Sequence, residues 1–324
     1  MPLFLSEADV QELLPMDRAL ERVEASFRAQ HAGQATNRSR ARILLPHTSL
    51  HYMAAALPEE NLMGLKIYTV SRQALRFVVL LFDTESGDLL ALIEADHLGR
   101  IRTGAASGVA TKFLARPDAS RVGLIGAGRQ ARTQLEGVAL IRKLTAVRVY
   151  SRNEATRRAF CREMSQALGI TVEPAESAES AARFGDIVIT ATTSSQPVVS
   201  GAALRPGTHV NAVGANMAKR RELDDVILAR AGVIAVDSLE QAKQEAGDLI
   251  QGLAALQRDW SGIVQLSEIV AGAHSGRRSN DEITIFKSCG IALWDVASAG
   301  FVYRRAIEAG KGKPLEVLDF KTST

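Results

Sequence analysis

A glycine-rich turn constrains the fold of this 324-residue chain more than any other feature of its sequence. Residues 121–131 read RVGLIGAGRQA and fit the spacing Gly126-x-Gly128-x-x-Ala131. The first glycine permits a tight turn, the second lets backbone approach a pyrophosphate, and the small Ala131 lets a helix pack on the preceding strand. Because the start of that helix offers unpaired amides, the motif predicts a dinucleotide site. A purely structural glycine turn is the alternative.

Short apolar runs alternate with helical patterns from residue 121 onward. We expect strands at 122–125, 147–150, 187–190, 210–213 and 233–236, with helices between several of them, including 130–142 and 154–168. This alternation favours an α/β fold with a doubly wound parallel sheet, the Rossmann architecture.

The first part of the chain has a different pattern. Residues 6–30 predict a helix with a capping box of Ser6 and Asp9, which Pro15 splits in two. Strands follow at 43–45, 50–53, 64–68 and 77–82, with a hairpin turn at 84–88, as expected for an antiparallel sheet in an α+β domain. A small-residue helix covers 103–115, and a last helix covers 284–309. We predict one domain of residues 1–115 with 290–324, and a second of 116–289.

Composition excludes several classes of function. Lys and Arg total 39 against 36 Asp and Glu, and a net charge of +3 is too weak to favour nucleic acid as a partner. The longest apolar run, 77–82, is too short to span a membrane. Cys161 and Cys289 form no disulfide framework, and no Cys/His spacing suggests a metal. With no signal-peptide pattern at the N-terminus, we expect the protein in the cytoplasm.

The end of the second strand of the parallel sheet distinguishes the two nicotinamide dinucleotides. NAD enzymes usually place a carboxylate there to hold the ribose, whereas this chain reads Ser151-Arg152-Asn153, with no acid before Glu154. Ser151 and Arg152 suit a 2′-phosphate, so we predict NADP, with NAD as the other possibility. Arg152 is otherwise an exposed arginine at a helix start. Arg129 and its neighbour Gln130, at the glycine turn, are further predicted cofactor contacts.

Cationic residues in the first domain are candidate anion ligands. Lys66 interrupts the apolar strand Met63-Gly-Leu-Lys-Ile-Tyr, where a charge is costly unless it is paired or functional. Its ammonium otherwise reaches solvent along its own apolar stem. Arg102 opens the small-residue helix, and Arg40 and Arg42 precede a strand. The sequence leaves open whether Glu94, Asp96 and His97 line a pocket or serve the fold.

Several segments together resemble the ornithine cyclodeaminase and mu-crystallin family. They are Gly-Leu-Lys66-Ile, Gly99-Arg-Ile-Arg102-Thr103-Gly-Ala-Ala-Ser-Gly-Val-Ala-Thr-Lys-Phe-Leu-Ala, Gly126-Ala-Gly-Arg-Gln-Ala-Arg-Thr-Gln, Asn211-Ala-Val-Gly-Ala-Asn216, Arg221-Glu-Leu-Asp224 and Glu282-Ile-Thr-Ile-Phe-Lys-Ser-Cys-Gly290. These segments cover nearly the whole chain in the family's order.

The resemblance implies a homodimer whose first domain binds substrate and builds the dimer, with a Rossmann domain for NAD(P). It implies that Arg40, Lys66 and Arg102 bind a substrate carboxylate, although Arg42 is an alternative to Arg40. His51 is a further predicted substrate contact. The predicted cofactor contacts implied by the glycine turn, the strand end and the resemblance are Thr103, Gly126, Ala127, Gly128, Arg129, Gln130, Ser151, Arg152, Asn153, Ala191, Val213 and Gly214.

One departure from the cyclodeaminase pattern bears on activity. Those enzymes carry an Asp in the loop that here reads Gly214-Ala215-Asn216, and a Glu where this chain has His51. Cyclodeamination needs proton transfers at nitrogen, and Asn216 cannot titrate. Imine reduction needs only an aligned hydride and a held iminium, which Asn216 can hydrogen-bond.

We therefore predict an NAD(P)H-dependent ketimine reductase that makes L-proline from Δ1-pyrroline-2-carboxylate, or L-pipecolate from Δ1-piperideine-2-carboxylate. Lys66 and Asn216 are its predicted catalytic residues. The alternatives are ornithine cyclodeaminase, alanine or another amino-acid dehydrogenase, and a non-catalytic NADPH-dependent binding protein.

Overall fold

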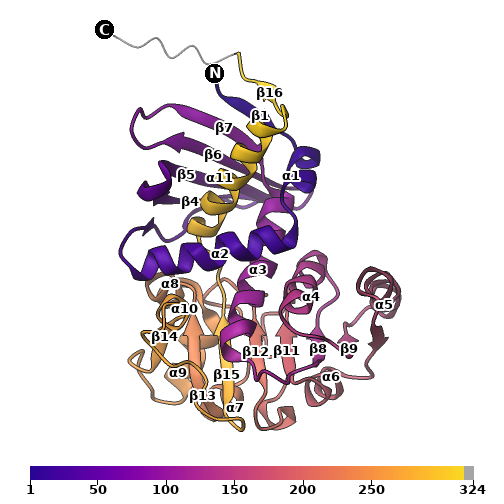
Figure 1. Ribbon diagram of the computed structural model, residues 1–324. Helices are drawn as coiled ribbons and strands as arrows, with labels where there is room; N and C mark the ends of the chain where they lie inside the picture. The colour runs from indigo at the N-terminus through magenta and orange to yellow at the C-terminus, as the bar shows by residue number, and fades with distance from the viewer. Residues whose placement is uncertain (317–324) are drawn as a thin grey trace. The chain divides into compact units, whose positions relative to one another are not determined.

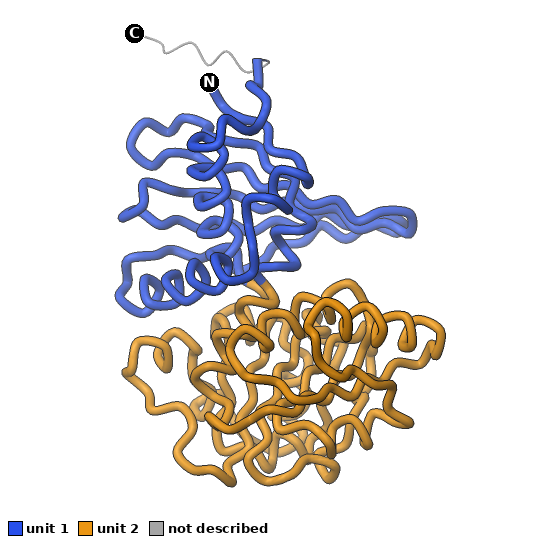
Figure 2. The backbone as a smooth tube through the Cα atoms, turned by 45° about the vertical axis from the view of Figure 1, so that its right-hand side comes forward, with its two compact units in different colours: residues 1–102, 291–324 blue, residues 103–290 orange. Residues whose placement is uncertain are grey.

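The structure, a computed structural model, describes residues 1–316 and divides the chain into two compact units (Figure 2). Unit 1 comprises residues 1–102 and the chain from 291 on, and unit 2 comprises residues 103–290. The expected boundaries at 115/116 and 289/290 differ chiefly within helix α3 (Asp96–Leu114), which begins in unit 1 and ends in unit 2. Residues 317–324, which the sequence assigned to the first domain, lie outside the described residues. The functions assigned to the two domains remain predictions.

Unit 1 is an α+β unit built on a mostly antiparallel sheet. The strands follow the order β16-β1-β7-β6-β5-β4-β2, and β3 pairs with β4. The elements are β1 (Leu3–Leu5), α1 (Glu7–Leu13), α2 (Met16–His31), β2 (Thr36–Asn37), β3 (Ala41–Leu44), β4 (Thr48–Leu57), the 3-10 helix η1 (Pro58–Glu60), β5 (Leu62–Ser71), β6 (Leu75–Asp83), β7 (Leu89–Glu94), α11 (Ala292–Glu308) and β16 (Lys313–Pro314).

Helices α2 and α11 form the core of unit 1 with this sheet. Helix α11 runs across strands β4 to β7 (Figure 1). The rings of Phe27 and Trp294, both fully buried, meet edge to face with their centroids 5.4 Å apart. The sheet therefore buries one face under a helix from the far end of the chain, a contact that no local sequence pattern reveals.

The predicted start of unit 1 is confirmed in detail. Ser6 and Asp9 form the capping box of α1, and Pro15 stands immediately before α2. The expected strands and the hairpin between β6 and β7 are present, although the strands are longer than expected.

The expected start of the next helix is wrong, because α3 begins at Asp96 and Arg102 lies in its second turn. The carboxylate of Glu7 accepts the backbone amides of Asp96 and His97, at 2.5 and 2.9 Å. A residue distant in sequence thus caps this helix.

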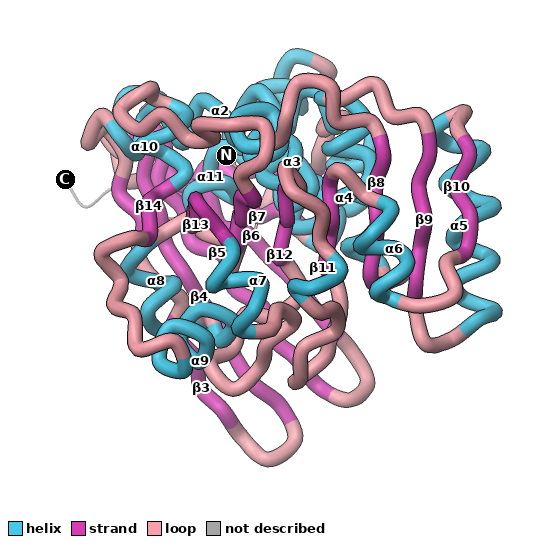
Figure 3. Tube along the Cα trace, turned by 90° about the horizontal axis from the view of Figure 1, so that it is seen from below, coloured by secondary structure: helices cyan, strands magenta, loops and turns pink. Residues whose placement is uncertain are grey.

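Unit 2 is a doubly wound parallel sheet, as predicted. The strands run in the order β10-β9-β8-β11-β12-β15-β13-β14, and Figure 3 shows β10, β9, β8, β11 and β12 side by side. The elements are β8 (Arg121–Ile125), α4 (Arg129–Ile141), β9 (Ala146–Tyr150), α5 (Glu154–Leu168), β10 (Thr171–Pro174), α6 (Ala178–Phe184), β11 (Ile187–Thr190), the 3-10 helix η2 (Gly201–Ala203), β12 (His209–Ala212), α7 (Asp225–Arg230), β13 (Ala231–Val236), α8 (Leu239–Glu245), α9 (Gly247–Ala255), β14 (Ile263–Gln265), α10 (Leu266–Val270) and β15 (Ile283–Lys287).

The predicted helix at 284–309 is wrong in its first part. Residues 283–287 form β15 in the middle of the parallel sheet, and α11 begins only at Ala292. Every residue of β15 is buried, so its two faces are both covered and it lacks the alternation that separates a strand from a buried helix. Gly290, with φ +77°, lies between the two elements, and its left-handed backbone conformation separates them.

Helices α3 and α4 meet through glycine. A Cβ on Gly104 would collide with the carbonyl group of Thr133, and a Cβ on Gly137 would collide with that of Gly104. The backbones of the two helices therefore touch directly, which explains why α3 is so rich in small residues.

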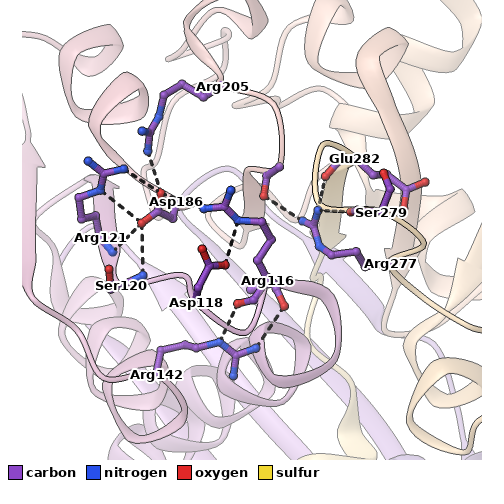
Figure 4. A network of polar contacts seen from close by, with 12 residues as sticks. Arg116, Asp118, Ser120, Arg121, Arg142, Asp186, Arg205, Arg277, Ser279 and Glu282 are labelled. Atoms are coloured by element: carbon purple, nitrogen blue, oxygen red, sulfur yellow. Dashed lines mark hydrogen bonds and ion pairs between the residues drawn. The ribbon is translucent and has the colours of Figure 1, made fainter.

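Arginines close the amino end of the parallel sheet (Figure 4). Asp186, just before β11, accepts hydrogen bonds from the guanidinium groups of Arg121 and Arg205 and from the backbone amides of Ser120 and Arg121. Burial raises the pKa of Asp186, but the hydrogen bonds outweigh it and hold this pKa below its ordinary value of 3.8. The carboxylate thus joins the starts of β8 and β11 to the segment that leads into β12.

No helix within residues 1–316 is both long and apolar enough to cross a membrane. The same residues bring together no group of three His, Cys, Asp or Glu side chains that could hold a metal ion.

We expect Asp186→Asn to lower the free energy of unfolding by about 2 kcal/mol at pH 7, since it leaves partly buried donors without the buried carboxylate that they share. A depressed native pKa stabilises the protein above pH 3.8, and this contribution is lost as the pH falls through the lower native pKa. The difference between variant and wild type should therefore shrink below about pH 4. Urea unfolding at several pH values measures it, with the exposed Asp281→Asn as control. Equal stability of the two variants at pH 7 would contradict this role for Asp186.

Candidate functional site

Lys66 occupies a core position on β5. Burial alternates along this strand, and Gly64, Lys66 and Tyr68 fall on its buried face. Only 3% of Lys66 is exposed, so the ammonium does not reach solvent along its stem. A position that the alternation reserves for an apolar residue therefore holds a charge, which must be compensated nearby.

Asp295 on α11 supplies this compensation. Its Oδ1 accepts hydrogen bonds from Lys66 Nζ at 2.6 Å and from Arg102 Nε at 3.1 Å. Asp295 is fully buried, and Arg102 is 5% exposed. The cations also lie near aromatic rings: Lys66 Nζ is 5.4 Å from the centroid of Phe77, and the Arg102 guanidinium is 5.5 Å from Trp294.

The charge of Arg40 acts both on Lys66 and on His51. Arg40, just before β3, is 7% exposed, and its charge helps to lower the pKa of Lys66. His51 on β4 stacks on Tyr68 with ring centroids 4.4 Å apart. Burial and the charges of Arg42 and Arg40 lower the pKa of His51 to about 4, so the ring is neutral at pH 7.

We define the cationic cluster as Arg40, Lys66, Arg102 and Asp295. Three positive groups and one carboxylate give it a net charge of +2. Burial, the charge of Arg102 and, to a smaller extent, that of Arg40 lower the pKa of Lys66 to about 8, although Asp295 opposes this shift. A cluster with this excess of buried positive charge is chemically suited to a carboxylate ligand.

In unit 2 the glycine turn has the geometry that its sequence predicts. Gly126 has φ +111°, and a Cβ there would collide with the carbonyl of Ala191. A Cβ on Gly128 would meet nothing within 4 Å, so packing does not require this glycine. Gly128 caps α4 without a side-chain hydrogen bond, which leaves the first amides of a 13-residue helix for a ligand.

A cavity of about 380 Å³ adjoins this turn at the carboxyl ends of β8, β9 and β11. Ligands bind at this edge of doubly wound sheets. The lining residues are Ile125, Gly126, Ala127, Gly128, Tyr150, Ser151, Arg152, Asn153, Thr156, Ala191, Thr192, Thr193, Ser194 and Val198.

No acidic residue lines this cavity. Asn153 caps α5 through the amide of Thr156, and Glu154 pairs with Arg158 at 2.7 Å. Arg157 donates to the carbonyl of Ser151. Arg152 has no ion pair or hydrogen bond within residues 1–316, and its guanidinium is available to a ligand.

Some predicted cofactor contacts lie outside the lining of this cavity. Thr103 is buried in α3, Arg129 and Gln130 begin α4, and Val213 and Gly214 follow β12. All the predicted cofactor contacts, inside and outside the lining, remain predictions.

The structure also indicates what the acidic residues before Arg102 do. Glu94 accepts the amide of Glu7 at the start of α1, and Asp96 pairs with Arg100. Burial and Arg100 lower the pKa of His97.

A buried ionic network holds the loop that carries Asn216. Lys287 Nζ donates to the carbonyl of Ala215 and lies 2.9 Å from Asp248 Oδ2, with both side chains fully buried. Glu222 accepts the amides of Gly214 and Thr192, each at 2.7 Å. Burial raises the pKa of Glu222. The loop before and after Asn216 is thus tied to the carboxyl ends of β11 and β15.

A model of the ornithine cyclodeaminase/mu-crystallin family matches residues 1–310. The chain belongs to this family. A Δ1-pyrroline-2-carboxylate reductase from Bacillus cereus is 33% identical over 326 aligned positions, covering 97% of this chain and 99% of the relative.

Solved structures agree with this assignment. The Δ1-pyrroline-2-carboxylate reductase of Thermococcus litoralis, in complex with NADH and L-proline, matches with a TM-score of 0.93 and 38% identity over 97% of this chain and all of that one. An archaeal alanine dehydrogenase dimer with bound NAD matches with a TM-score of 0.93 and 33% identity over 98% and 99% of the two chains.

Sequence reasoning missed several residues of these sites. Asp295 stands in the uniformly buried first half of α11, where its only signal is a lone acid among apolar and small residues. Thr156, Thr192, Thr193 and Ser194 line the cavity, although nothing in their local sequence sets them apart. Lys287 follows a buried apolar run, as Lys66 does, and the same cost of burying a charge could have marked it.

We expect Lys287→Met to lower the free energy of unfolding by about 3–5 kcal/mol, because it leaves Asp248 and Glu222 buried without a cation. Urea unfolding of the variant measures the loss, with the exposed Lys243→Met as control. Adding Asp248→Leu to Lys287→Met should recover part of the stability. A Lys287→Met protein as stable as the control would refute the network's role.

Proposed function

We propose that the protein reduces a cyclic imino acid with NAD(P)H, converting Δ1-pyrroline-2-carboxylate to L-proline or Δ1-piperideine-2-carboxylate to L-pipecolate. One observation carries the proposal: two buried cations, Lys66 and Arg102, share the carboxylate of Asp295, and the charge of a third, Arg40, acts on Lys66. The relatives of this chain include a Δ1-pyrroline-2-carboxylate reductase. The neighbour that holds NADH and L-proline supports the same substrate class, since L-proline is the product of this reduction.

The cationic cluster binds the substrate carboxylate in this proposal. Lys66 and Arg102 are held by Asp295, so their donors are ordered before the ligand arrives. Arg40 adds a third positive charge, and the neutral His51 contacts the substrate without adding another. We prefer Arg40 to Arg42 because Arg40 is the more buried and its charge acts on Lys66.

The residues around the glycine turn fit a dinucleotide. The open space at Gly128 admits a pyrophosphate close to the backbone, and the amides of α4 face its charge. When bound, the nicotinamide supplies the hydride. Asn216, on the loop anchored by Lys287 and Glu222, hydrogen-bonds the substrate nitrogen. Because an amide does not titrate, this residue suits reduction of a ready-made iminium better than the proton transfers of a cyclodeaminase.

We favour NADPH over NADH for this chain. The solved neighbours hold NADH or NAD, but no carboxylate here lines the part of the cavity that would face the ribose. Arg152 and Ser151 stand there, and Arg152 has no partner within residues 1–316. A guanidinium and a hydroxyl are suitable ligands for a 2′-phosphate.

We propose further that the protein is a homodimer. Apolar side chains stand exposed on β3 to β6 of unit 1, where a partner would cover them: Ile43, Leu44, Leu45, Tyr52 and Leu75. A cytoplasmic location fits the two free, buried cysteines.

The direct test offers Δ1-pyrroline-2-carboxylate with NADPH and with NADH and follows cofactor absorbance. We expect stoichiometric cofactor oxidation with formation of L-proline, and a loss of about 100-fold in kcat/KM in Lys66→Ala through loss of a charge-assisted contact. Cofactor affinity should stay unchanged in this variant.

Parallel incubations distinguish the rival activities. L-ornithine with NAD that yields ammonia and proline without net cofactor turnover indicates a cyclodeaminase. L-alanine with NAD that yields pyruvate, ammonia and NADH indicates an alanine dehydrogenase. Either activity, in a protein that does not reduce the cyclic imines, overturns the proposal.

For the cofactor, we expect Arg152→Ala to weaken NADPH binding by about 10- to 100-fold, since a charge-assisted hydrogen bond to a phosphate contributes about 1.5–3 kcal/mol. NADH binding should change little. Fluorescence titration with both reduced cofactors measures the two dissociation constants, and Arg162→Ala, an exposed arginine on α5 outside this cavity, is the control. Equal changes for NADPH and NADH would show that Arg152 does not select the 2′-phosphate.

A further inference from the structure

Asp295 is the one carboxylate in contact with Lys66 and Arg102 among the described residues, and the resemblance did not point to it. Oδ1 of Asp295 takes both hydrogen bonds, from Nζ of Lys66 and Nε of Arg102. Its Oδ2 is buried and has no hydrogen-bond partner within residues 1–316, and the same is true of Nη1 of Arg102.

The unmatched donor of Arg102 distinguishes this cluster from an ion pair that serves the fold alone. A buried ion pair that serves the fold alone is expected to satisfy its remaining donors and acceptors, because each unsatisfied group costs stability. Here the cluster retains a free guanidinium donor beside a lysine that Asp295 already holds in place. The hydrogen bonds of this cluster are incomplete within the protein, and an anion could accept one from the open guanidinium donor.

We propose that Asp295 is a positioning residue that keeps Lys66 charged and fixed for substrate binding. This inference rests on the proposed function. Without a neighbouring carboxylate, a fully buried ammonium beside two guanidinium groups loses its proton readily. Asp295 offsets that tendency, and its contact at 2.6 Å leaves the ammonium little freedom of rotation.

The charged and titratable groups around Lys66 come from every neighbouring element. Arg102 on α3 and Arg40 before β3 lower its pKa, and Asp295 on α11 raises it. His51 on β4, whose pKa is about 4, stays neutral throughout the range in which Lys66 titrates. Burial has the largest effect of all, and the resulting pKa of about 8 lies close to neutral pH.

The sign of the expected effect follows from these contributions. Removing the negative charge of Asp295 lowers the pKa of Lys66 further, so Lys66 becomes neutral at a lower pH. Substrate binding needs the charged form, and therefore the alkaline limb of kcat/KM moves toward acid. The bound carboxylate itself stabilises the ammonium, so kcat shifts less and the loss at high pH falls mainly on KM.

The experiment measures kcat/KM for Δ1-pyrroline-2-carboxylate between pH 6 and 10 in four proteins. We expect wild type to show an alkaline limb near pH 8, and Asp295→Asn to move it down by about one unit or more. Asp295→Glu, which keeps the charge, should return the limb toward wild type. The exposed Asp88→Asn, on a turn of the same unit, should leave it unchanged. An unshifted limb in a folded Asp295→Asn protein overturns the inference.

Lys66→Arg identifies the group that titrates. Arginine stays charged throughout this range, so the limb should disappear in this variant. If the limb persists in Lys66→Arg, another group is responsible and the inference is wrong.

Binding of L-proline provides a readout that does not depend on turnover. Its dissociation constant, in the presence of the oxidised cofactor, should rise at high pH in wild type and at lower pH in Asp295→Asn. This measurement remains usable if the variant is slow. Activity and binding together separate the two hypotheses. A wild type that reduces no imino acid refutes the proposed function, whereas pH-independent L-proline binding in all variants refutes the role of Asp295.

Discussion

The burial of positive charge under helix α11 is the constraint on which the candidate substrate site depends. The carboxylate of Asp295 lies between Lys66 and Arg102 and offsets part of the cost of burying these two charges inside unit 1. Burial away from water makes a charged side chain less stable. It also strengthens electrostatic attraction, so the buried cations attract an anion more strongly than exposed ones would. One carboxylate does not neutralise the three cations of the cluster, so the cluster keeps an excess of positive charge.

The two units differ in the chemical groups that they offer to a ligand. Unit 1 offers a candidate anion site made of long charged side chains that strands and helices hold in place. Unit 2 presents backbone amides at the start of α4 and leaves open space at Gly128, where no side chain stands. In the proposed function, the placement of charge thus selects the ligand of unit 1, and exposed backbone amides select that of unit 2.

Much of this could be predicted from the sequence, because the signals were local. The glycine turn, the capping box at Ser6 and the alternation of short strands with helices each depend on a few neighbouring residues. The unusual position of Lys66 was visible for the same reason, since one charge within an apolar strand stands out.

The rest depended on contacts between distant parts of the chain. The start of α3 is fixed by Glu7, far away in sequence, and the partner of Lys66 is separated from it by 229 residues. The sequence pattern predicts helix where β15 lies, because a strand that is buried on both faces lacks the alternation of apolar and polar residues that identifies a strand. The NADP preference remains a prediction, since it depends on the conformation of Arg152 toward a phosphate.

The direct contact between Gly104 and Gly137 has a mechanical consequence for unit 2. With no side chains between the two backbones, there is nothing that can repack when one helix is displaced. Helix α4, whose first turn follows Gly128, and the part of α3 beginning at Thr103 must then move as one solid piece. A methyl group added at either glycine would collide with the facing backbone, and the only relief would be a separation of the two helices.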